Sequence, residues 1–435
     1  MIVGSRLRTL GVLGLLTATL PVDLAVTAVA LLTTPRVRPA PAAAPKTVLI
    51  SGGKMTKALQ LARSFAASGH RVVLVEKGTY RFTGHRFSRA VDRFHVVPDP
   101  RDPGYADALL DVVRREGVDL YVPVCSPVAS QFDARAMDVL APHCEVLSPD
   151  ADTVATLDDK YRFAELAASL GLTVPDTHRI TAPEQVLDFD FAAARGRRYV
   201  LKSLAYDPVH RLDLTPLPLP SRAETAAFLS GKPISAENPW ILQEFVAGRE
   251  FCTHTTARAG RITVWVCSES SAFQVNYAAV DEPRIREWVT TLVAGLGLTG
   301  QVSFDFLEAD DGTPYAIECN PRTHSAITAF HDHPGLADAY LGARDTPLEP
   351  LPDSRPTYWI YHELWRALAG PQAAWRSLRT VLAGTDAVFD RSDPLPYLVL
   401  HHVQIPILLL RALVRGTDWS RIDVNIGKLV APGGD

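Results

Sequence analysis

The sequence predicts an α/β fold in which a parallel sheet with flanking helices comes first and antiparallel strands follow. Short apolar runs at 48–50 and 72–75 are typical of buried strands, and the helical pattern between them ends at Gly69. Two further apolar runs, at 120–124 and 144–147, alternate with helical stretches, and this βαβ spacing indicates a parallel sheet. Later strands come in adjacent pairs joined by short turns, which indicates antiparallel hairpins.

The elements expected after residue 150 start with a helix, because Asp158 and Asp159 are acidic residues suited to a helix start. That helix is expected to end at Gly171, and a proline-rich loop is expected at 207–221. The other elements, in order, are strands at 198–203, 241–246, 251–255 and 262–267, a helix at 283–296, and strands at 301–308 and 315–320.

The composition is that of a globular protein with enough apolar residues for buried cores. Of the 435 residues, 47% are hydrophobic and 21% are charged, and this length predicts roughly two to four structural units. The formal net charge of −4 gives no reason to expect nucleic acid as a partner. The cysteines are odd in number and lack the close spacing of a zinc site, which indicates free thiols in a reducing compartment. They are Cys125, Cys144, Cys252, Cys267 and Cys319.

An apolar run at 10–32 follows Arg6 and Arg8 and sets the N-terminal segment apart from the rest of the chain. Three interpretations are open: a secretory signal, a membrane-spanning helix, and a shallow or re-entrant membrane anchor. Pro21 and Asp23 lie in the middle of the run, and an aspartate at mid-membrane costs roughly 2.5–3.5 kcal/mol on insertion scales. This cost favours an anchor over a clean span.

A second apolar run, at 397–413, lies near the C-terminus. It is shorter, and His401, His402 and Pro406 interrupt it, so a membrane span is not expected here. A buried C-terminal helix is the favoured interpretation, and a membrane-facing surface is the alternative.

The most informative pattern lies on the strands at 301–308 and 315–320. Because side chains alternate between the two faces of a strand, Asp305 points away from its apolar neighbours, and Glu318 shares a face with Asn320. Pairing of the strands would bring these three side chains together as oxygen ligands that suit Mg²⁺ (or Mn²⁺). A hairpin that carries only surface acids is the alternative.

Asp305 and the string Ile317-Glu318-Cys319-Asn320-Pro321-Arg322 resemble the metal-binding end of the ATP-grasp superfamily. The resemblance implies the ATP-grasp fold with an N-terminal Rossmann-like (pre-ATP-grasp) domain, ATP and Mg²⁺ as cofactors, and Asp305, Glu318 and Asn320 as metal ligands. The other roles that it implies are Lys160, Lys202 and Arg322 for the phosphates and for catalysis, Glu244, Phe245 and Val246 for the adenine, and Glu250 for the ribose. Two lysine ammonium groups over a polyphosphate are physically reasonable, because they are compact point charges.

The stretch after Lys202 departs from the family pattern. Many members cover the phosphates with a loop rich in glycine or serine, but residues 203–211 contain no glycine. His210 or Arg211 is expected to replace the backbone contacts of that loop.

Five further strings resemble the mycosporine-glycine synthase group of the superfamily, and the similarity covers essentially the whole chain. They lie at 51–59, 121–130, 318–326, 356–363 and 425–430. This resemblance implies 4-deoxygadusol and glycine as substrates, with an enolic oxygen of the ring phosphorylated before the glycine amine displaces phosphate. The candidate substrate residues are Ser126, Ser130, His324 and Ser325. Three of these candidates have an alternative: Ser126 and Ser130 would only cap a helix start, and His324 would only hydrogen-bond its own loop.

The resemblance also implies a division of the chain, while the oligomeric state is left open. The expected parts are an apolar segment and linker at 1–45, the Rossmann-like domain at 46–150, the ATP-grasp domain at 151–340 with a small lobe at about 175–250, and a C-terminal region with an apolar helix at 341–435. Because the chemistry needs ATP, secretion is disfavoured, and we expect a cytoplasmic protein with membrane attachment through 10–32.

Three other functions were weighed against this one. The first is a different ATP-grasp ligase, which makes an amide through an acyl phosphate. The second is a nicotinamide-dependent oxidoreductase, because Gly52 and Gly53 end a strand and Glu76 ends the next, although the third glycine of a dinucleotide fingerprint is absent. The third is a membrane-associated binding protein without catalytic activity.

Overall fold

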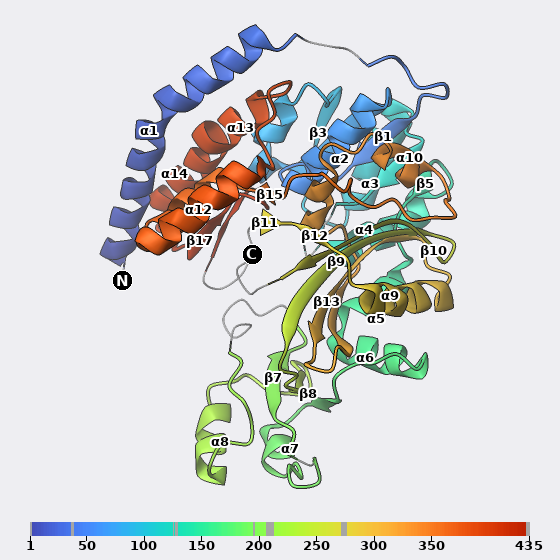
Figure 1. Cartoon of the computed structure of the whole chain (residues 1–435), viewed down its shortest axis with the longest axis vertical. Helices are drawn as coiled ribbons and strands as arrows, with labels where there is room; N and C mark the ends of the chain where they lie inside the picture. Colours follow the sequence, from blue (N-terminus) through green and yellow to red (C-terminus); the bar gives the residue numbers. More distant parts are fainter. Residues whose placement is uncertain are drawn as a thin grey trace.

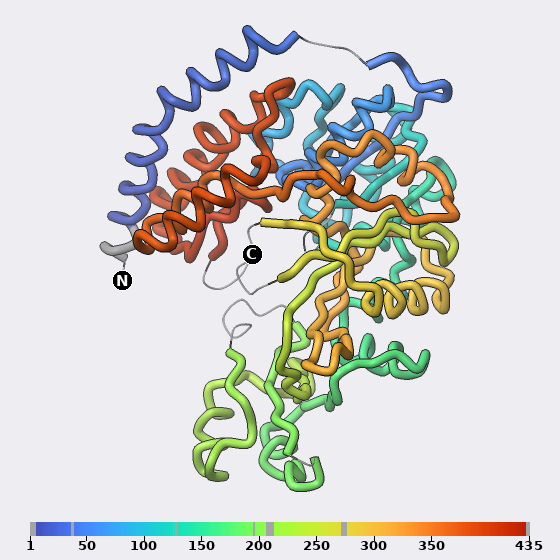
Figure 2. Tube along the Cα trace, in the orientation of Figure 1, coloured from blue at the N-terminus to red at the C-terminus, as the bar shows by residue number. Residues whose placement is uncertain are grey.

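The computed structural model describes the backbone of residues 2–35, 39–124, 126, 129–194, 196–205, 213–270 and 276–431, and side chains from residue 6 onward. These residues form a parallel sheet, a larger antiparallel sheet, a small lobe and a helical C-terminal region (Figure 1). Figure 2 shows the first helix, in blue, running beside the last helices, in red, while the small lobe extends away from the rest at the opposite end.

The predicted parallel sheet is confirmed, and its strand order is β3-β2-β1-β4-β5; the edge strand β3 was not predicted. Its strands are β1 (Thr47–Ile50), β2 (Arg71–Lys77), β3 (Arg93–Val97), β4 (Leu120–Val122) and β5 (Glu145–Val146), and the helices between or beside them are α2 (Thr56–Ala67), α3 (Tyr105–Glu116) and α4 (Ser130–Leu140). The turn after β1 requires glycine at Gly52, because φ is +67° and a Cβ atom there would lie 1.8 Å from the carbonyl oxygen of Val124.

The antiparallel sheet has the order β12-β10-β9-β13-β14. Its strands are β9 (Arg249–Arg258), β10 (Arg261–Glu269), β12 (Ala279–Val280), β13 (Gly300–Glu308) and β14 (Pro314–Asn320), and the neighbouring helices are α5 (Ala151–Asp158), α6 (Lys160–Ser169) and α9 (Pro283–Gly295). Phe163, Trp288 and Phe304 pack together between these helices and the sheet. The predicted helix start is confirmed, because the Asp159 side chain caps α6 by accepting from two backbone amides.

The small lobe is built on a three-stranded sheet of order β6-β8-β7. Its elements are β6 (Thr177–Ile180), α7 (Pro183–Leu187), β7 (Tyr199–Ser203), α8 (Arg222–Leu229) and β8 (Trp240–Glu244). Leu201, Leu242 and Val186 belong to its own buried cluster. Residues of the central strand β8 and the edge strand β7 line the cavity described below, so the lobe supplies one wall of the site.

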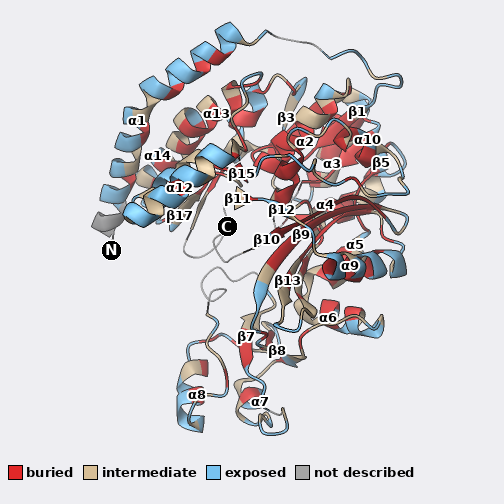
Figure 3. Cartoon of the chain, in the orientation of Figure 1, coloured by how far each residue is buried: buried red, intermediate tan, exposed pale blue. Residues whose placement is uncertain are grey.

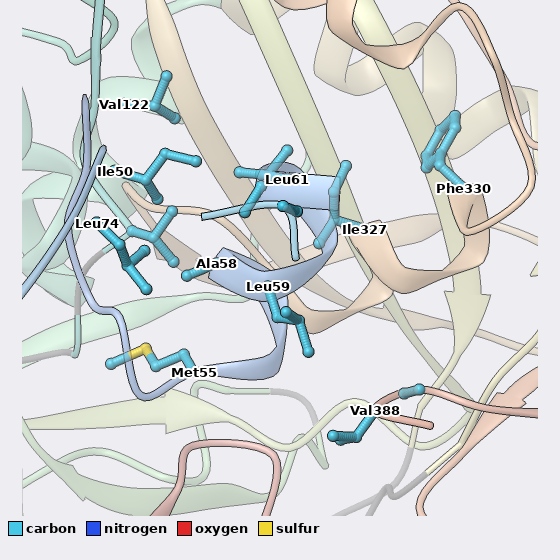
Figure 4. Close-up of a cluster of buried hydrophobic side chains, with 14 of the residues drawn as sticks. Ile50, Met55, Ala58, Leu59, Leu61, Leu74, Val122, Ile327, Phe330 and Val388 are labelled. Carbon is cyan, nitrogen blue, oxygen red and sulfur yellow. The ribbon is translucent and has the colours of Figure 1, made fainter. Parts of the chain in front are cut away.

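The C-terminal region packs into the core of the parallel sheet. Its elements are α11 (Ile360–Ala367), α12 (Pro371–Ala383), α13 (Leu395–Val399), π-helix η4 (Leu400–Gln404), α14 (Ile405–Arg415), and the hairpin of β17 (Arg421–Asp423) and β18 (Lys428–Val430). The 3₁₀ helix η3 (Ser325–Phe330) and α10 (Leu336–Leu341) precede it in the chain. A small sheet joins its strands β15 (Thr357–Tyr358) and β16 (Thr385–Asp386) to the earlier strand β11 (Asn276–Tyr277). Figure 4 shows α2 side chains such as Leu59 and Leu61 between Ile50 on one side and Ile327 on the other.

One buried cluster contains Leu16, Ile50, Ile327 and Leu400, which come from all four parts of the chain that the sequence suggested. The C-terminal region and the parallel sheet therefore share a core. The boundaries expected at 46, 151 and 341 stay a prediction.

The N-terminal segment is one long helix, α1 (Ile2–Thr33), which contains Pro21. It packs on α13, η4 and α14. The buried residues Thr9, Leu16, Asp23 and Ala30 recur at intervals of seven and form one stripe along the helix. The remainder of its surface is mostly exposed, as Figure 3 shows in pale blue. The helix therefore docks by one narrow face and leaves an apolar face open.

Two helical segments among the described residues are long and apolar enough to cross a membrane by length and composition alone, namely Arg6–Thr33 and Leu395–Arg415. The expectation that the second run is too short and interrupted is corrected here. A π turn at 400–404 carries the helix from α13 into α14 past Pro406, so the helical segment is continuous over 21 residues.

Candidate functional site

The hairpin of β13 and β14 brings together the three oxygen-bearing side chains that the sequence singled out. Asp305 lies opposite Glu318 in the strand register, and the Asn320 amide donates to the Asp305 carboxylate at 3.3 Å. Val302 and Phe304 are fully buried on the opposite face, as strand alternation predicts. The predicted convergence of the three side chains is therefore present in the structure, whereas metal binding by them stays a prediction.

The two carboxylates repel each other in a place with little solvent. Burial, together with the charge of Glu318, raises the pKa of Asp305 to about 7. Burial would also raise the pKa of Glu318, but the charges of Lys160 and Arg322 lower it below its usual value. A bound cation would relieve this repulsion.

The donor set fits magnesium but not a metal that needs several protein ligands. No group of three His, Cys, Asp or Glu side chains able to hold a metal occurs among the described residues. Magnesium typically keeps several waters and takes one or two carboxylates plus phosphate oxygens. Asp305 and Glu318, with the amide oxygen of Asn320, match that requirement when a polyphosphate supplies further oxygens.

Three cationic side chains surround the carboxylates, and each is held by a partner. Lys160 Nζ lies 3.2 Å from Glu318 Oε1. Lys202, on β7, donates to the Gln243 side chain at 2.8 Å, and burial lowers its pKa to about 8. Arg322 forms an ion pair with Asp158 at 3.3 Å. Positive charges from two lobes therefore face one another across the site, an arrangement that suits an anion with several charges.

The segment after β8 forms the wall that the sequence assigned to adenine and ribose. Glu244, Phe245, Val246 and Glu250 all line the cavity. The Glu244 carboxylate is already engaged, because it accepts from the Asp176 amide at 3.2 Å and pairs with Arg197 at 3.4 Å.

The backbone amide of Val246 and the side chain of Glu250 are better placed to contact a ligand than the Glu244 side chain. The Val246 amide has no hydrogen-bond partner in the described part of the chain, so its donor is free for a base. Glu250 accepts from the Ser270 hydroxyl at 3.0 Å. The roles of these residues in binding ATP stay predictions.

These walls belong to one cavity of about 1180 Å³. Ligand sites typically have volumes of roughly 300–1,000 Å³, so this cavity has room for more than one small ligand. From the carboxylate hairpin and the small lobe it continues to α1, α11 and the hairpin β17–β18. Residues of the first 16 positions and of the last 20 therefore line the same space as the carboxylates.

The far end of the cavity contains residues to which no role could be assigned from the sequence. They are Arg8, Leu15, Leu16, Trp359, Tyr361, His362, Trp365, Arg366, Trp419 and Arg421. The strings at 356–363 and 425–430 hold part of the signal for these residues, because they resemble a subgroup of the superfamily. Nothing in the sequence placed those strings beside the carboxylates, since the distance along the chain is large.

The four predicted substrate residues do not lie together. His324 lines the large cavity, and its Nδ1 accepts from the Ala326 amide at 3.2 Å, so the neutral ring carries its proton on Nε2. Ser325 accepts from Asn425 at 2.7 Å. Ser126 lines a separate, small cavity beside the parallel sheet, and the Ser130 hydroxyl donates to the Ser126 carbonyl at 3.3 Å.

A substrate role for Ser126 and Ser130 has no support from the large cavity, and it stays a prediction. The alternative of a helix cap does not hold for these serines either, because the residue before α4 is Ala129 and no side chain caps this helix start; the Ser130 hydroxyl donates to a carbonyl instead of accepting from an amide. The suggested lid residues His210 and Arg211 lie outside the described residues.

Comparison with known proteins identifies the fold. No family model matches the chain. Two solved structures each have a TM-score of 0.53: biotin carboxylase from Campylobacter jejuni, in a complex described as β-γ-ATP, and N5-carboxyaminoimidazole synthetase from Staphylococcus aureus with ADP. The first is 15% identical and covers 69% of this chain and 72% of its own, and the second is 14% identical and covers 74% and 82%. The chain has the ATP-grasp fold.

Two curated proteins are similar in sequence over part of the chain. The carbamoyl phosphate synthase large chain of Halobacterium salinarum is 24% identical over 279 residues, which are 58% of this chain and 25% of that protein. The C-terminal section of the same enzyme from Methanopyrus kandleri is 23% identical over 242 residues, which are 50% and 43%. The chain thus spans less than half the length of the curated relatives that it matches.

Proposed function

We propose that this protein is an ATP- and magnesium-dependent ligase that forms a carbon–nitrogen bond. The observation that carries the proposal is the convergence, around one cavity, of a carboxylate pair with cations from two lobes. The similar proteins are named as a carbamoyl phosphate synthase, a biotin carboxylase and a synthetase solved with ADP, and these names agree with a nucleotide-dependent reaction.

The side chains divide the work of phosphoryl transfer among them. Asp305, Glu318 and Asn320 would hold magnesium, which supplies charge neutralisation on the phosphates. Lys160 and Lys202 would bind the polyphosphate from its two sides, and Arg322 would face the phosphoryl group during transfer. These cations stand in a cavity with low solvent access, where preorganised charges stabilise a transition state more strongly than in water.

For the substrates we propose 4-deoxygadusol and glycine. An enolic oxygen of the ring takes the γ-phosphoryl group of ATP, which leaves ADP and an enol phosphate. The glycine amine then adds to the ring carbon that bears the phosphate. The bond between that carbon and the enolic oxygen breaks, phosphate leaves with the oxygen, and the amine loses a proton, which gives mycosporine-glycine. A vinylogous acid oxygen is a poor leaving group, and phosphorylation improves it. Support comes from Trp359, Tyr361, His362 and Asn425, which lie in the subgroup strings and line the cavity.

The closest competing proposal is an ATP-grasp ligase that joins a carboxylate to an amine through an acyl phosphate. It would use the same nucleotide and metal residues, because fold and site are shared across these chemistries. The two proposals differ only in the acceptor.

A nicotinamide-dependent oxidoreductase is disfavoured by the geometry after β1. The first turn of α2, where a dinucleotide pyrophosphate would bind, is occupied, because the Thr56 amide donates to the Asn425 carbonyl at 2.9 Å. Glu76, which would hold the ribose, accepts from the Lys54 amide at 3.1 Å. Both positions that a dinucleotide needs are thus filled by the protein itself.

We also propose a cytoplasmic protein that attaches to an anionic membrane surface through the open face of α1. Leu10, Val22, Val29 and Leu32 are exposed on that helix, with exposed fractions between 52% and 87%. Arg6 near the start of the helix, together with the arginines of the neighbouring α14, gives the same region positive charge. An apolar face flanked by basic residues suits a helix that lies in the membrane interface.

Incubation of the full chain with 4-deoxygadusol, glycine, ATP and magnesium tests the function. Mass spectrometry should detect mycosporine-glycine, and ADP and phosphate should appear in equal amounts. The Asp305→Ala variant is the matched blank. ADP release with a carboxylic acid and an amine, but no adduct of glycine and 4-deoxygadusol, would replace this proposal by the acyl phosphate ligase. No ADP release with any pair would favour a binding protein without catalysis.

A further inference from the structure

The far end of the cavity is a chamber with aromatic walls and a helical roof. We define the acceptor chamber by Leu16, Tyr361, His362, Arg366, Trp419 and Arg421, all of which line the same cavity as Asp305 and Lys202. The chamber is built from α1, α11 and β17, together with the segment before β17. It therefore needs both ends of the chain, which are far from the nucleotide residues in sequence.

The walls are flat and fixed in position. Tyr361 stacks on His401 with ring centroids 4.1 Å apart. The Trp419 indole donates to Thr9 at 3.0 Å, and the Arg8 guanidinium lies over its ring at 4.1 Å. Because the partners hold these rings, the chamber presents preorganised aromatic faces that suit a flat ligand.

The chamber also contains polar groups that lack a full set of protein partners. The Nε2 atom of His362 is buried and has no hydrogen-bond partner among the residues that the structure describes. A buried polar atom without a partner costs free energy, and a ligand atom would remove that cost.

The guanidinium groups of the chamber keep free donors as well. Arg421 pairs with Asp423 at 3.5 Å and remains partly exposed, and Arg366 pairs with Glu363 at 2.9 Å. A guanidinium has five N–H donors, so each arginine retains donors for an anion. His362 stands in the electrostatic field of both arginines and both carboxylates.

The apolar N-terminal helix closes the chamber. Val12, Leu15 and Leu16 of α1 line the cavity, and Leu16 belongs to the main buried core. Asp23 ties the helix to the wall, because it accepts from Tyr361 at 2.7 Å. The helix is thus a structural part of the cavity, besides any role at a membrane.

We propose that the acceptor chamber binds the ligase acceptor as a flat cyclic enolate, with His362 and Arg421 on its oxygens and α1 as the roof. This inference rests on the proposed function and makes it more specific, because it assigns binding of the ring to residues to which no role could be assigned from the sequence. The ring lies between the aromatic walls, and its enolic oxygen points along the cavity toward the phosphate-binding residues.

Direct binding of a simple ring tests the chamber without requiring turnover. The probe is cyclohexane-1,3-dione, a flat vinylogous acid, titrated calorimetrically into the full chain with ADP and magnesium present. The variants are His362→Phe, which keeps a flat ring but removes both nitrogens, and Arg421→Gln, which removes the charge. Arg379→Gln is the matched control, because Arg379 lies on α12 and does not line the cavity.

We expect the wild type and Arg379→Gln to bind the probe, and each chamber variant to bind it at least about tenfold more weakly, as loss of a hydrogen bond to a charged group implies. Affinity for ADP and the thermal midpoint should stay unchanged, which excludes misfolding. Equal affinity for the probe in all four proteins, or no binding of the probe by the wild type, overturns the proposal that the acceptor chamber binds the ring. If the probe binds and binding depends on His362 and Arg421, but no ligase product forms, the ring-binding role of the chamber is supported and the proposed function is rejected.

Discussion

Asp23, in the apolar N-terminal helix, accepts a hydrogen bond from the hydroxyl group of Tyr361 at 2.7 Å, although 338 positions separate the two residues in the chain. The same carboxylate accepts from Tyr397 at 3.1 Å and contacts His402 at 2.7 Å. This acid, which looks costly in an apolar run, is therefore the polar contact that fixes α1 on the C-terminal helices. Since Tyr361 lines the cavity, the contact also connects α1 to the site.

Replacement of Asp23 by leucine should release α1 from the body of the protein. Two tyrosine hydroxyls and the His402 ring would lose their shared acceptor, and breaking a buried pair of this kind costs about 3–5 kcal/mol. Hydrogen exchange of the amides at 9–30 should become faster, and the denaturant midpoint should fall. Thr17→Val is the control, because Thr17 is exposed and bonds only to its own helix at 2.8 Å. Exchange rates equal to those of the wild type would show that Asp23 does not hold the helix.

Replacement of Asp305 or Glu318 by alanine should abolish ADP release while the protein stays folded. Removal of Asp305 relieves its repulsion with Glu318, and removal of Glu318 costs only a partly exposed ion pair with Lys160, so the fold should persist. Either change takes away a metal ligand that contributes several kcal/mol at the transition state. We expect a rate loss of at least about a thousandfold, which corresponds to about 4 kcal/mol. The control is Asp310→Asn at the tip of the same hairpin. Near-normal rates in both alanine variants would eliminate the proposed metal site.

Lys202→Met should weaken ATP binding more than it changes the fold. Lys202 is half-buried and donates to Gln243, and methionine fills a similar volume without the charge. We expect the KM for ATP to rise about tenfold or more, because a charge-assisted contact to phosphate is worth about 1.5–3 kcal/mol. Lys46→Met, at an exposed pair with Asp119, should leave the KM for ATP unchanged. An unchanged KM in Lys202→Met would contradict a phosphate role.

The stability of the protein should fall as the pH drops below about 6.5, partly because of buried histidines. Burial lowers the pKa of His85 to about 3, and burial also lowers the pKa of His254 well below its usual value. The unfolded chain takes up these protons near pH 6.5 and the folded chain does not, so acid favours unfolding. For His85, with a folded pKa of about 3, this loss amounts to about 2 kcal/mol at pH 5.

Thermal or urea unfolding between pH 7 and pH 5 measures this loss. His85→Gln should flatten the pH dependence, because glutamine has no titrating group and its amide can still donate to the Gly53 carbonyl that His85 contacts at 3.0 Å. His178→Gln, at a partly exposed position, is the control for the effect of a histidine-to-glutamine change itself. The same slope in His85→Gln as in the wild type would contradict the assignment.

The open face of α1 should bind vesicles that contain anionic lipid. A triple variant, Leu10→Ser, Val22→Ser and Val29→Ser, removes apolar area that is already exposed, so stability should change little while membrane affinity falls. Co-sedimentation with vesicles of phosphatidylglycerol and phosphatidylcholine measures the bound fraction, which we expect to drop at least about tenfold because each buried apolar side chain contributes about 1.5–3 kcal/mol. Equal sedimentation of the variant and the wild type would remove the membrane proposal.

Much of the site was predictable because it depends on local rules. Alternation along β13 and β14 sets Asp305, Glu318 and Asn320 on one face, and the acidic start of α6 sets Lys160 at its first turn. These outcomes need only short stretches of chain and one tight turn. The sequence did not predict that Ser126 lies outside the large cavity. The packing of the lobes determines which edge of the parallel sheet opens onto that cavity, and this packing is not a local property of the chain.

Local rules predict which side chains share a face of β13 and β14, where α6 begins, and that a hairpin carries carboxylates, since each feature follows from neighbouring residues. That α1 and the hairpin β17–β18 enclose the same cavity as the carboxylate hairpin becomes visible only in the folded chain. The folded chain also gives Asp23 its protein partners, which the cost of an acid in an apolar run does not reveal. Such contacts depend on the fit of surfaces that are hundreds of residues apart, and no local periodicity records which surfaces meet.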